Sequence, residues 1–280
     1  MNDRPKAPYG DLYIYYVKGR VAPDPAIRKD CALIGTWQEE EDAFLFFHRP
    51  AETAISGLLQ RQSHLKIEDR FVMTYDQWHG GPIEPVTVGR LTIVPAWHAI
   101  PDAAGADTIR LDPGVVFGTG THPTTRDCLE ALQLAFDYRP VASVLDLGTG
   151  TGLLAVAAAH LGARRVVALD LNHLAAATAL RNVELNRMTG RIVVVQGNAK
   201  NYIDLACDLM VSNIHHAVMG ELIVSPQFQK HSQFIVSGLL RSQAREIEAL
   251  LRERAAVILR RWSREDVWFT FWGTNAETGG

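Results

Sequence analysis

The sequence predicts an α/β protein in which a doubly wound, mostly parallel sheet of seven strands follows a smaller α+β region. From about residue 120, short apolar runs alternate with segments of helical period. A glycine-rich loop follows the first of these runs and precedes a helical segment. Strands that alternate with helices in this way are typical of βαβ units.

The first hundred residues have a different pattern. Short β-like runs at residues 12–17, 43–47 and 91–95 are separated by proline and glycine, and a helical stretch covers 51–62. We therefore predict a small α+β domain with its linker over residues 1–100. Two tryptophans late in this region, Trp78 and Trp97, are expected to hold it against the rest of the chain.

Residues 101–280 are predicted to form the second domain. Its strands are expected at residues 141–145, 165–169, 191–195, 209–212, 233–237, 257–261 and 267–272. Its helices are expected from residue 152, over 172–187, through the 220s and over 241–254. Because only a short turn at 263–266 joins the last two strands, they should form an antiparallel hairpin at one end of the sheet.

Composition excludes several classes of protein. Of 280 residues, 47% are hydrophobic and 21% charged, which is typical of a globular chain, and the net charge of −3 provides no overall field for a nucleic-acid backbone. The cysteines Cys31, Cys128 and Cys207 form no Cys-x-x-Cys pair, so neither a metal site nor a disulfide framework is indicated. No secretory signal or membrane span is recognisable, and we expect a cytoplasmic monomer that binds no membrane. The arginines between 241 and 264 are interpreted mainly as a solvated helix face, with a patch for ribosomal RNA as the alternative.

The strongest local signal is the sequence V-L-D-L-G-T-G-T-G over residues 144–152. Gly148, Gly150 and Gly152 allow a ligand to approach the backbone, and the helix that follows offers free N–H groups. The third glycine falls one place too early for the dinucleotide pattern G-x-G-x-x-G. Asp146 would repel a diphosphate, but it suits a ligand with an ammonium group, such as the methionine part of S-adenosylmethionine.

A second carboxylate follows the next strand. Asp170 lies 22 residues after Gly148, the spacing at which an acidic side chain reaches ribose hydroxyls in nucleotide-binding folds. Nicotinamide and adenosylmethionine enzymes share this feature. The alternative is a purely structural turn at 148–152, with Asp170 capping the helix that starts near Asn172.

Two further segments point to one family. The string F-G-T-G-T-H-P-T-T at 117–125 precedes the first parallel strand, and S-N-I at 212–214 ends the fourth. Together with the glycine loop, they resemble the PrmA family of lysine methyltransferases that modify ribosomal protein L-eleven. The match covers residues 110–272, whereas the first 75 residues match loosely and are shorter than the substrate-recognition domain of that family. The resemblance implies a class I methyltransferase with a Rossmann-like fold and S-adenosylmethionine as methyl donor.

The resemblance also implies donor contacts at Thr125, Gly148, Asp170 and Asn213. By position, the other residues expected around the donor are Thr124, Asp146, Gly150, Gly152 and, with a weaker basis, Asn198 at the adenine edge. Thr124 and Thr125 follow Pro123 in a first helical turn, where their hydroxyls and amides would face a carboxylate. Phe117 either lines the adenosine or methyl channel or packs beneath the loop.

Catalysis is expected at the end of the fourth strand, where open α/β sheets place their ligands. An Asn213 carbonyl there can orient an acceptor amine. His122, His215 and His216 are candidates for taking its proton, although His122 also suits a helix cap and His215 and His216 a substrate channel. The family continues after Asn-Ile with Leu-Ala-Gly-Pro, whereas this chain has His-His-Ala-Val, a departure on the acceptor side.

The favoured function is methylation of a lysine or N-terminal amine of a ribosomal protein. Alternatives are another protein lysine, such as one in the β-subunit of electron-transfer flavoprotein, or a small-molecule amine. Base methylation is disfavoured because no proline or aromatic residue follows Asn213 to stack a flipped base. The remaining alternatives are a non-catalytic adenosylmethionine-binding module and a nicotinamide oxidoreductase.

Overall fold

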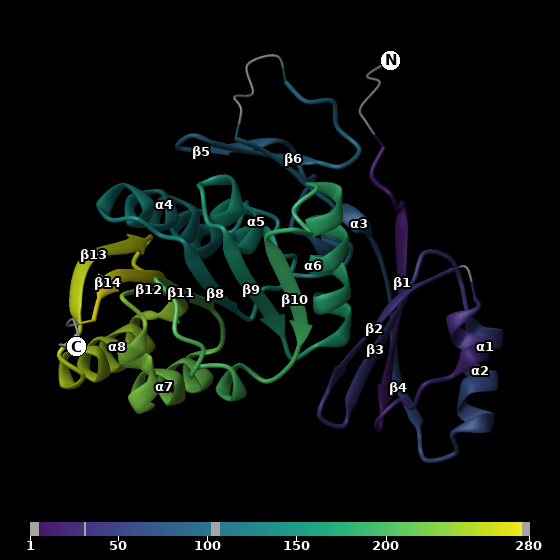
Figure 1. Ribbon diagram of the computed structural model, residues 1–280. Coiled ribbons are helices and arrows are strands. Elements are labelled where there is room, and N and C mark those ends of the chain that lie inside the picture. The colour runs from purple at the N-terminus through teal and green to yellow at the C-terminus, as the bar shows by residue number, and fades with distance from the viewer. Residues whose placement is uncertain (1–5, 31, 102–106, 276–280) are drawn as a thin grey trace.

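The core of the molecule is a seven-stranded sheet, seen in a computed structural model that describes residues 6–30, 32–101 and 107–275. Its order is β10-β9-β8-β11-β12-β14-β13, and only β14 runs antiparallel to its neighbours (Figure 1). The strands are β8 (Ser143–Leu147), β9 (Arg165–Asp170), β10 (Ile192–Gln196), β11 (Leu209–Asn213), β12 (Gln233–Leu240), β13 (Val257–Arg264) and β14 (Trp268–Thr274). The predicted doubly wound sheet with a C-terminal hairpin is therefore confirmed.

Helices cover both faces of this sheet, as the period of the sequence predicted. One apolar core lies beneath α4 (Pro123–Tyr138), α5 (Leu153–His160) and α6 (His173–Leu185). The other lies beneath α7 (His216–Val224) and α8 (Arg241–Glu253). None of the helices in the described residues is both long and apolar enough to cross a membrane.

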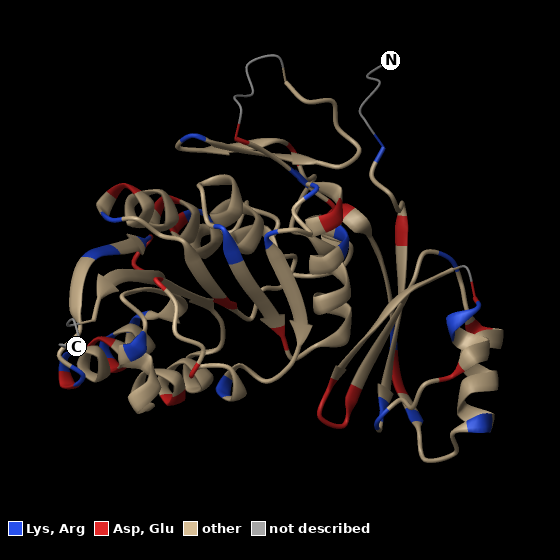
Figure 2. Cartoon of the chain, in the orientation of Figure 1, with Lys and Arg blue, Asp and Glu red and all other residues tan. Residues whose placement is uncertain are grey.

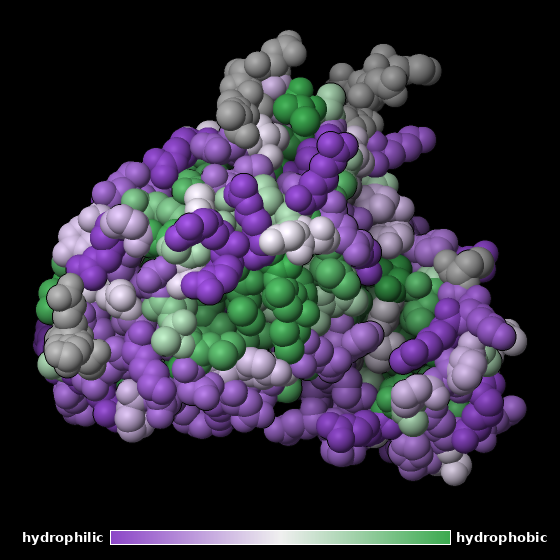
Figure 3. All heavy atoms as spheres, viewed as in Figure 1, coloured by the Kyte–Doolittle hydropathy of each residue, from purple (hydrophilic) through white to green (hydrophobic). Residues whose placement is uncertain are grey.

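The second face is incompletely covered near β10. The connection from β10 to β11 contains only a short 3₁₀ turn, η1 (Ala199–Asn201), instead of a full helix. Val193 on β10 is consequently 60% exposed, and apolar side chains gather over this part of the molecule (Figure 3).

The N-terminal region forms a separate antiparallel sheet of order β2-β3-β1-β4. Its strands are β1 (Asp11–Lys18), β2 (Leu33–Glu39), β3 (Asp42–Phe47) and β4 (Lys66–Thr74). Helices α1 (Pro25–Arg28) and α2 (Glu52–Arg61) pack on one face of this sheet. The sequence predicted β1, β3 and α2 but not β2 and β4, because most side chains of β4 are exposed and no apolar alternation marks it.

The run at 91–95 is a strand, as predicted, but it does not join the N-terminal sheet. β6 (Leu91–Pro95) pairs with β5 (Val86–Val88) and β7 (Thr108–Leu111) and packs in the core beneath α4 and α5. The division of domains at residue 100 stays a prediction. The expected tie through Trp78, on α3 (Tyr75–Trp78), is present, because its Nε1 donates to Val115 O at 3.2 Å and its ring meets Phe46 edge-on. Trp97 packs edge-on against Tyr75 at 6.1 Å between centroids.

Candidate active site

The glycine loop is anchored where β8 and β9 end. The N–H groups of Gly148 and Thr149 both donate to Leu169 O at 2.9 Å, and Gly150 N donates to Asp170 Oδ2 at 3.0 Å. Asp170 Oδ1 accepts from Asn172 N at 2.9 Å, at the start of α6. Asp170 therefore joins the loop to α6, the capping role that the structural alternative expected, while its contact with a ribose stays a prediction.

Each glycine of the loop is required by its conformation. Gly148, Gly150 and Gly152 have φ values of +77°, +55° and +81°, which L side chains rarely adopt. A Cβ on Gly148 would lie 2.1 Å from Ile214 Cγ2, and one on Gly150 would lie 2.6 Å from Phe117 O. Glycine at these positions therefore leaves the loop backbone without side chains on the side that faces β11 and the 117–125 segment.

A small hollow of about 20 Å³ opens beside this loop, and we call it the donor cavity. It is lined by Phe117, Gly118, Thr125, Gly148, Thr149, Gly150, Thr151, Leu153, Leu154 and Asn213. Five predicted site residues meet here: Phe117, Thr125, Gly148, Gly150 and Asn213. The other predicted residues, which do not line it, are His122, Thr124, Asp146, Gly152, Asp170, Asn198 and His215.

Asp146 lies fully buried behind the loop. Its Oδ2 accepts from Thr149 Oγ1 at 2.6 Å, whereas Oδ1 has no hydrogen-bond partner among the described residues, and neither does Thr125 Oγ1. Burial raises the pKa of Asp146 to about 7. Buried polar atoms in folded proteins are normally satisfied, and a polar ligand at the glycine loop would give these two atoms partners. The bare backbone, the carboxylate and the hydroxyl together fit the zwitterionic methionine part of S-adenosylmethionine.

The first turn of α4 is organised by His122, which caps the helix as expected. Its Nδ1 accepts from Thr124 N at 3.3 Å and lies 2.8 Å from Thr124 Oγ1. Its ring meets Phe117 and Trp268 edge-on, and burial lowers the pKa of His122. The lowered pKa favours the neutral imidazole, in which Nδ1 can accept the hydrogen bond from Thr124 N that caps the helix.

Asn213 ends β11 inside the donor cavity. Its Nδ2 donates to Thr124 Oγ1 at 3.3 Å, so one amide end is tied to α4 and Oδ1 is turned the other way. Gly238, in the middle of β12, has φ +84°, and a Cβ there would lie 2.9 Å from Asn213 Oδ1. Sequence reasoning missed Gly238, although an isolated glycine inside an apolar strand indicates a close approach of another group.

We predict that Gly238→Ala slows any reaction that depends on Asn213. The added methyl group must displace the amide oxygen, and the left-handed φ adds strain of about 1 kcal/mol. We expect kcat to fall about tenfold, measured in a methyl-transfer assay with the thermal midpoint followed in parallel. Gly220→Ala is the matched control, because a Cβ there meets only Leu250 Cδ1 at 3.6 Å. A Gly238→Ala enzyme with unchanged kcat would show that Gly238 makes no room that Asn213 needs.

Three predicted residues lie away from the donor cavity or play a second role. Asn198 caps η1 through its Oδ1, which accepts from Lys200 N at 3.0 Å. His215 is exposed and caps α7, and its ring centroid lies 4.7 Å from that of His216. Phe117 is 54% exposed and belongs to the cavity lining, its carbonyl accepts from Thr151 N at 3.2 Å, and its role toward the donor stays a prediction.

A buried ion pair supports α4 from the far side. Asp127, which is 0% exposed, accepts from Arg264 Nε at 2.7 Å, and Arg264 Nη2 also reaches Glu130. The C-terminal arginines therefore do not all lie on one solvated face, because Arg264 is held in this ion pair. The interpretation does describe Arg245 and Arg252 of α8, which are exposed. No local signal in the sequence marked Asp127.

Comparison with known proteins agrees with this site. The family model described as "Ribosomal protein L11 methyltransferase (PrmA)" matches residues 25–275. A protein named ribosomal protein L11 methyltransferase from Cyanothece is 34% identical over 244 residues, covering 85% of this chain and 78% of that protein. One of the same name from Desulfitobacterium hafniense is 39% identical, covering 63% of this chain and 56% of that protein.

A solved structure extends the comparison to the fold. The ribosomal protein L11 methylase from Lactobacillus delbrueckii subsp. bulgaricus aligns with a TM-score of 0.61 and 31% identity, covering 69% of this chain and all of that one. The class I methyltransferase fold is thus confirmed, with S-adenosylmethionine as methyl donor. Because the family model spans nearly the whole chain and the glycine loop, Thr125 and Asn213 meet in one cavity, this protein belongs to the ribosomal protein L11 methyltransferase (PrmA) family.

Proposed function

We propose that this protein transfers methyl groups to amino groups of ribosomal protein L11, at lysine side chains or the N-terminal amine. The observation that carries the proposal is the donor cavity, where Thr125 and the bare glycine loop face Asn213 and the buried Asp146 lies just behind. The names of the relatives support the choice of acceptor. We further propose that the enzyme acts as a monomer in the cytoplasm.

Bound S-adenosylmethionine supplies an electrophilic methyl group on a sulfonium. Asp146 Oδ1 would accept from the ammonium of the donor, and Thr125 Oγ1 would donate to its carboxylate. Asp170 keeps lone pairs for ribose hydroxyls beside the two N–H groups that it already accepts. Asn198 would meet the adenine edge. These contacts hold the donor in place, and orientation of this kind supplies much of the rate of a bimolecular transfer.

The acceptor must arrive as a neutral amine. A lysine of pKa about 10.4 costs roughly 4–5 kcal/mol to deprotonate at pH 7. Apolar walls lower that cost because burial disfavours the ammonium form, and Phe117 and Leu153 provide such walls. Asn213 Oδ1 would accept an N–H of the amine and turn its lone pair toward the methyl group, without placing a cation near the departing charge.

The role of His215 as a base can be separated from its role as a cap. His215→Asn keeps a good N-cap side chain on α7 and removes the imidazole ring. We expect KM for the acceptor to rise about threefold and the pH–rate profile to keep its shape, since the ring is exposed and outside the cavity lining. His216→Asn serves as the paired variant. Loss of the acid limb in His215→Asn alone would instead identify His215 as the base.

The proposed function is tested with purified ribosomal protein L11 and isotopically labelled S-adenosylmethionine. We expect label on L11, with mass spectrometry locating it on lysine or N-terminal amines, and about a hundredfold slower transfer by Asn213→Ala. Donor binding without transfer to L11, but with transfer to another protein or to a small amine, would overturn the choice of acceptor. Binding without transfer to any substrate in a cell extract would favour the non-catalytic alternative.

A further inference from the structure

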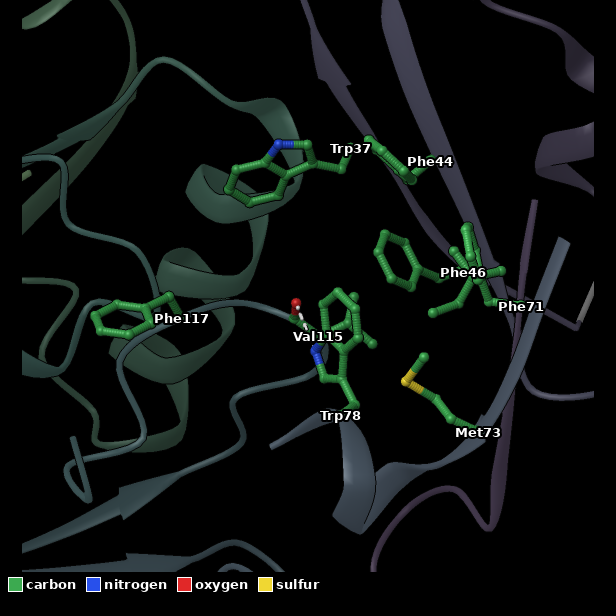
Figure 4. Close-up of a pocket in the computed structure, with 9 residues that line it drawn as sticks. Trp37, Phe44, Phe46, Phe71, Met73, Trp78, Val115 and Phe117 are labelled. Carbon is green, nitrogen blue, oxygen red and sulfur yellow. Dashed lines mark hydrogen bonds between the residues drawn. The ribbon is translucent and has the colours of Figure 1, made fainter. Parts of the chain in front are cut away.

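A second, wholly apolar pocket lies between the N-terminal sheet and the part of the chain that is built on the seven-stranded sheet, which we call the catalytic half. We call this pocket the aromatic pocket. It has a volume of about 490 Å³ and six aromatic residues in its lining: Trp37, Phe44, Phe46, Phe71, Trp78 and Phe117. Figure 4 shows Phe44, Phe46, Phe71 and Met73 on one side, Trp78 and Val115 in the middle of the view, and Phe117 on the far side with its ring turned away from the others. The pocket exists because α1 and α2 cover only one face of the N-terminal sheet, while the catalytic half covers the other face in part.

The aromatic pocket adjoins the donor cavity. Phe117 lines both, and a third hollow shares Trp78 and Phe117 with the first and Gly118 with the second. Three of the aromatic residues are more than one-third exposed: Phe71 is 39% exposed, Trp78 37% and Phe117 54%. Exposed rings gathered in a concave site are characteristic of a recognition surface and not of a closed core.

Carboxylates border the pocket at the tip of the β2–β3 hairpin. Trp37 pairs with Phe44, and two residues further along each strand Glu39 pairs with Asp42, about 7 Å away. Asp42 is neutralised by Lys18 at 2.8 Å, but the turn adds Glu40 and Glu41. The hairpin tip is accordingly the most strongly acidic part of the N-terminal sheet (Figure 2).

We propose that the aromatic pocket holds a large apolar side chain of the acceptor protein, while basic residues next to that side chain face Glu39, Glu40 and Glu41. The acceptor amine then reaches the donor cavity on the other side of Phe117. This inference rests on the proposed function and adds to it a sequence requirement: the methylated amine belongs to a segment with an apolar anchor and flanking positive charge.

The test compares neighbouring residues on opposite faces of β4. Phe71→Ala shortens a pocket side chain, whereas Val72→Ala changes a residue that is 65% exposed and outside the pocket. With ribosomal protein L11 as acceptor, we expect KM to rise about tenfold in Phe71→Ala. Neither kcat at saturating L11 nor the Kd for S-adenosylhomocysteine should change more than about twofold, and Val72→Ala should match the wild type.

The acidic border is tested separately by Glu39→Lys, with Glu253→Lys on α8 as control. We expect a several-fold rise in KM that shrinks as salt is added, because exposed charges are screened. Wild-type KM in a Phe71→Ala enzyme with a normal thermal midpoint would overturn the pocket assignment and leave the proposed function intact. Absence of both binding and methylation of L11 by the wild type would overturn the proposed function, and this inference with it.

Discussion

Replacing Asp146 by asparagine is expected to weaken donor binding about 30-fold or more while making the ligand-free protein more stable at pH 8. The carboxylate has one oxygen without a hydrogen-bond partner among the described residues. Loss of its charge removes the group that would pair with the ammonium of the donor, and buried charge-assisted hydrogen bonds contribute about 2–3 kcal/mol. Isothermal titration with S-adenosylhomocysteine measures the loss directly.

The opposite effect on stability follows from the raised pKa. Burial moves the pKa of Asp146 from 3.8 to about 7, so the folded state favours the protonated acid. The stability that this provides is complete below pH 3.8 and is lost as pH rises through 7. Three pKa units correspond to about 4 kcal/mol as an upper bound. Asparagine stays neutral, so the Asp146→Asn protein should unfold at higher temperature at pH 8, with the difference shrinking toward pH 4.

The same group predicts how donor affinity depends on pH. Since the ammonium favours the ionised carboxylate, wild-type affinity for S-adenosylhomocysteine should rise between pH 6 and pH 8, and Asp146→Asn should show a flat profile. Thr149→Val, which replaces the hydroxyl that donates to Oδ2 by a methyl group, is the matched control and should keep a pH-dependent affinity, with the rise shifted to higher pH because the bond from Thr149 lowers the pKa of Asp146. Equal affinities and equal slopes in wild type and Asp146→Asn would contradict a role for Asp146 in the donor site.

Arg264→Ala is expected to destabilise the fold by about 3 kcal/mol at pH 8, the lower end of the range for a broken buried pair. Asp127 is fully buried, whereas the Arg264 side chain is 43% exposed, so water can partly replace it. Burial raises the pKa of Asp127 even with Arg264 attached. Without the guanidinium the pKa rises further, and the destabilisation should be smaller at pH 5, where the buried acid takes up a proton.

Urea unfolding of three variants separates the causes. Arg241→Ala breaks a surface pair with Asp266, whose side chain is 72% exposed, and should cost less than about 1 kcal/mol. The double variant Arg264→Ala with Asp127→Asn removes the uncompensated charge and should recover most of the loss. Similar free energies of unfolding for the single and double variants would show that the charge on Asp127 is not the cause.

The strands, the glycine loop and the hairpin of the catalytic half could be predicted from the sequence because each depends on neighbouring residues. Alternating strands and helices predicted all seven strands of the large sheet, with β8 beginning two residues later than expected. The glycine loop was recognisable because positive φ values select glycine. The C-terminal hairpin was recognisable from its short polar turn, where Glu265 and Asp266 adopt left-handed φ values of +52° and +56°. Each of these signals lies within a few consecutive residues.

The N-terminal sheet shows where local signals fail. β4 has charged and apolar residues without regular alternation, and it is a strand because it pairs along its length with β1. The strand at 91–95 was visible as a strand, but its partners β5 and β7 could not be told from its own sequence. Strand pairing is decided by segments that meet in space, so composition alone cannot assign a strand to a sheet.

The sequence by itself determined the sheet of the catalytic half, the bare-backbone loop and the chemistry of the acid beside it, because dihedral preference and apolar period act over neighbouring residues. Only the tertiary structure decided that Asn213 is tied to Thr124, 89 residues away, and that Asp127 meets Arg264 across 137. It alone also brought six aromatic residues from β2, β3, β4, α3 and the segment before α4 around one pocket. Such contacts depend on burial and on the packing of whole elements, which cannot be predicted from a short stretch of sequence.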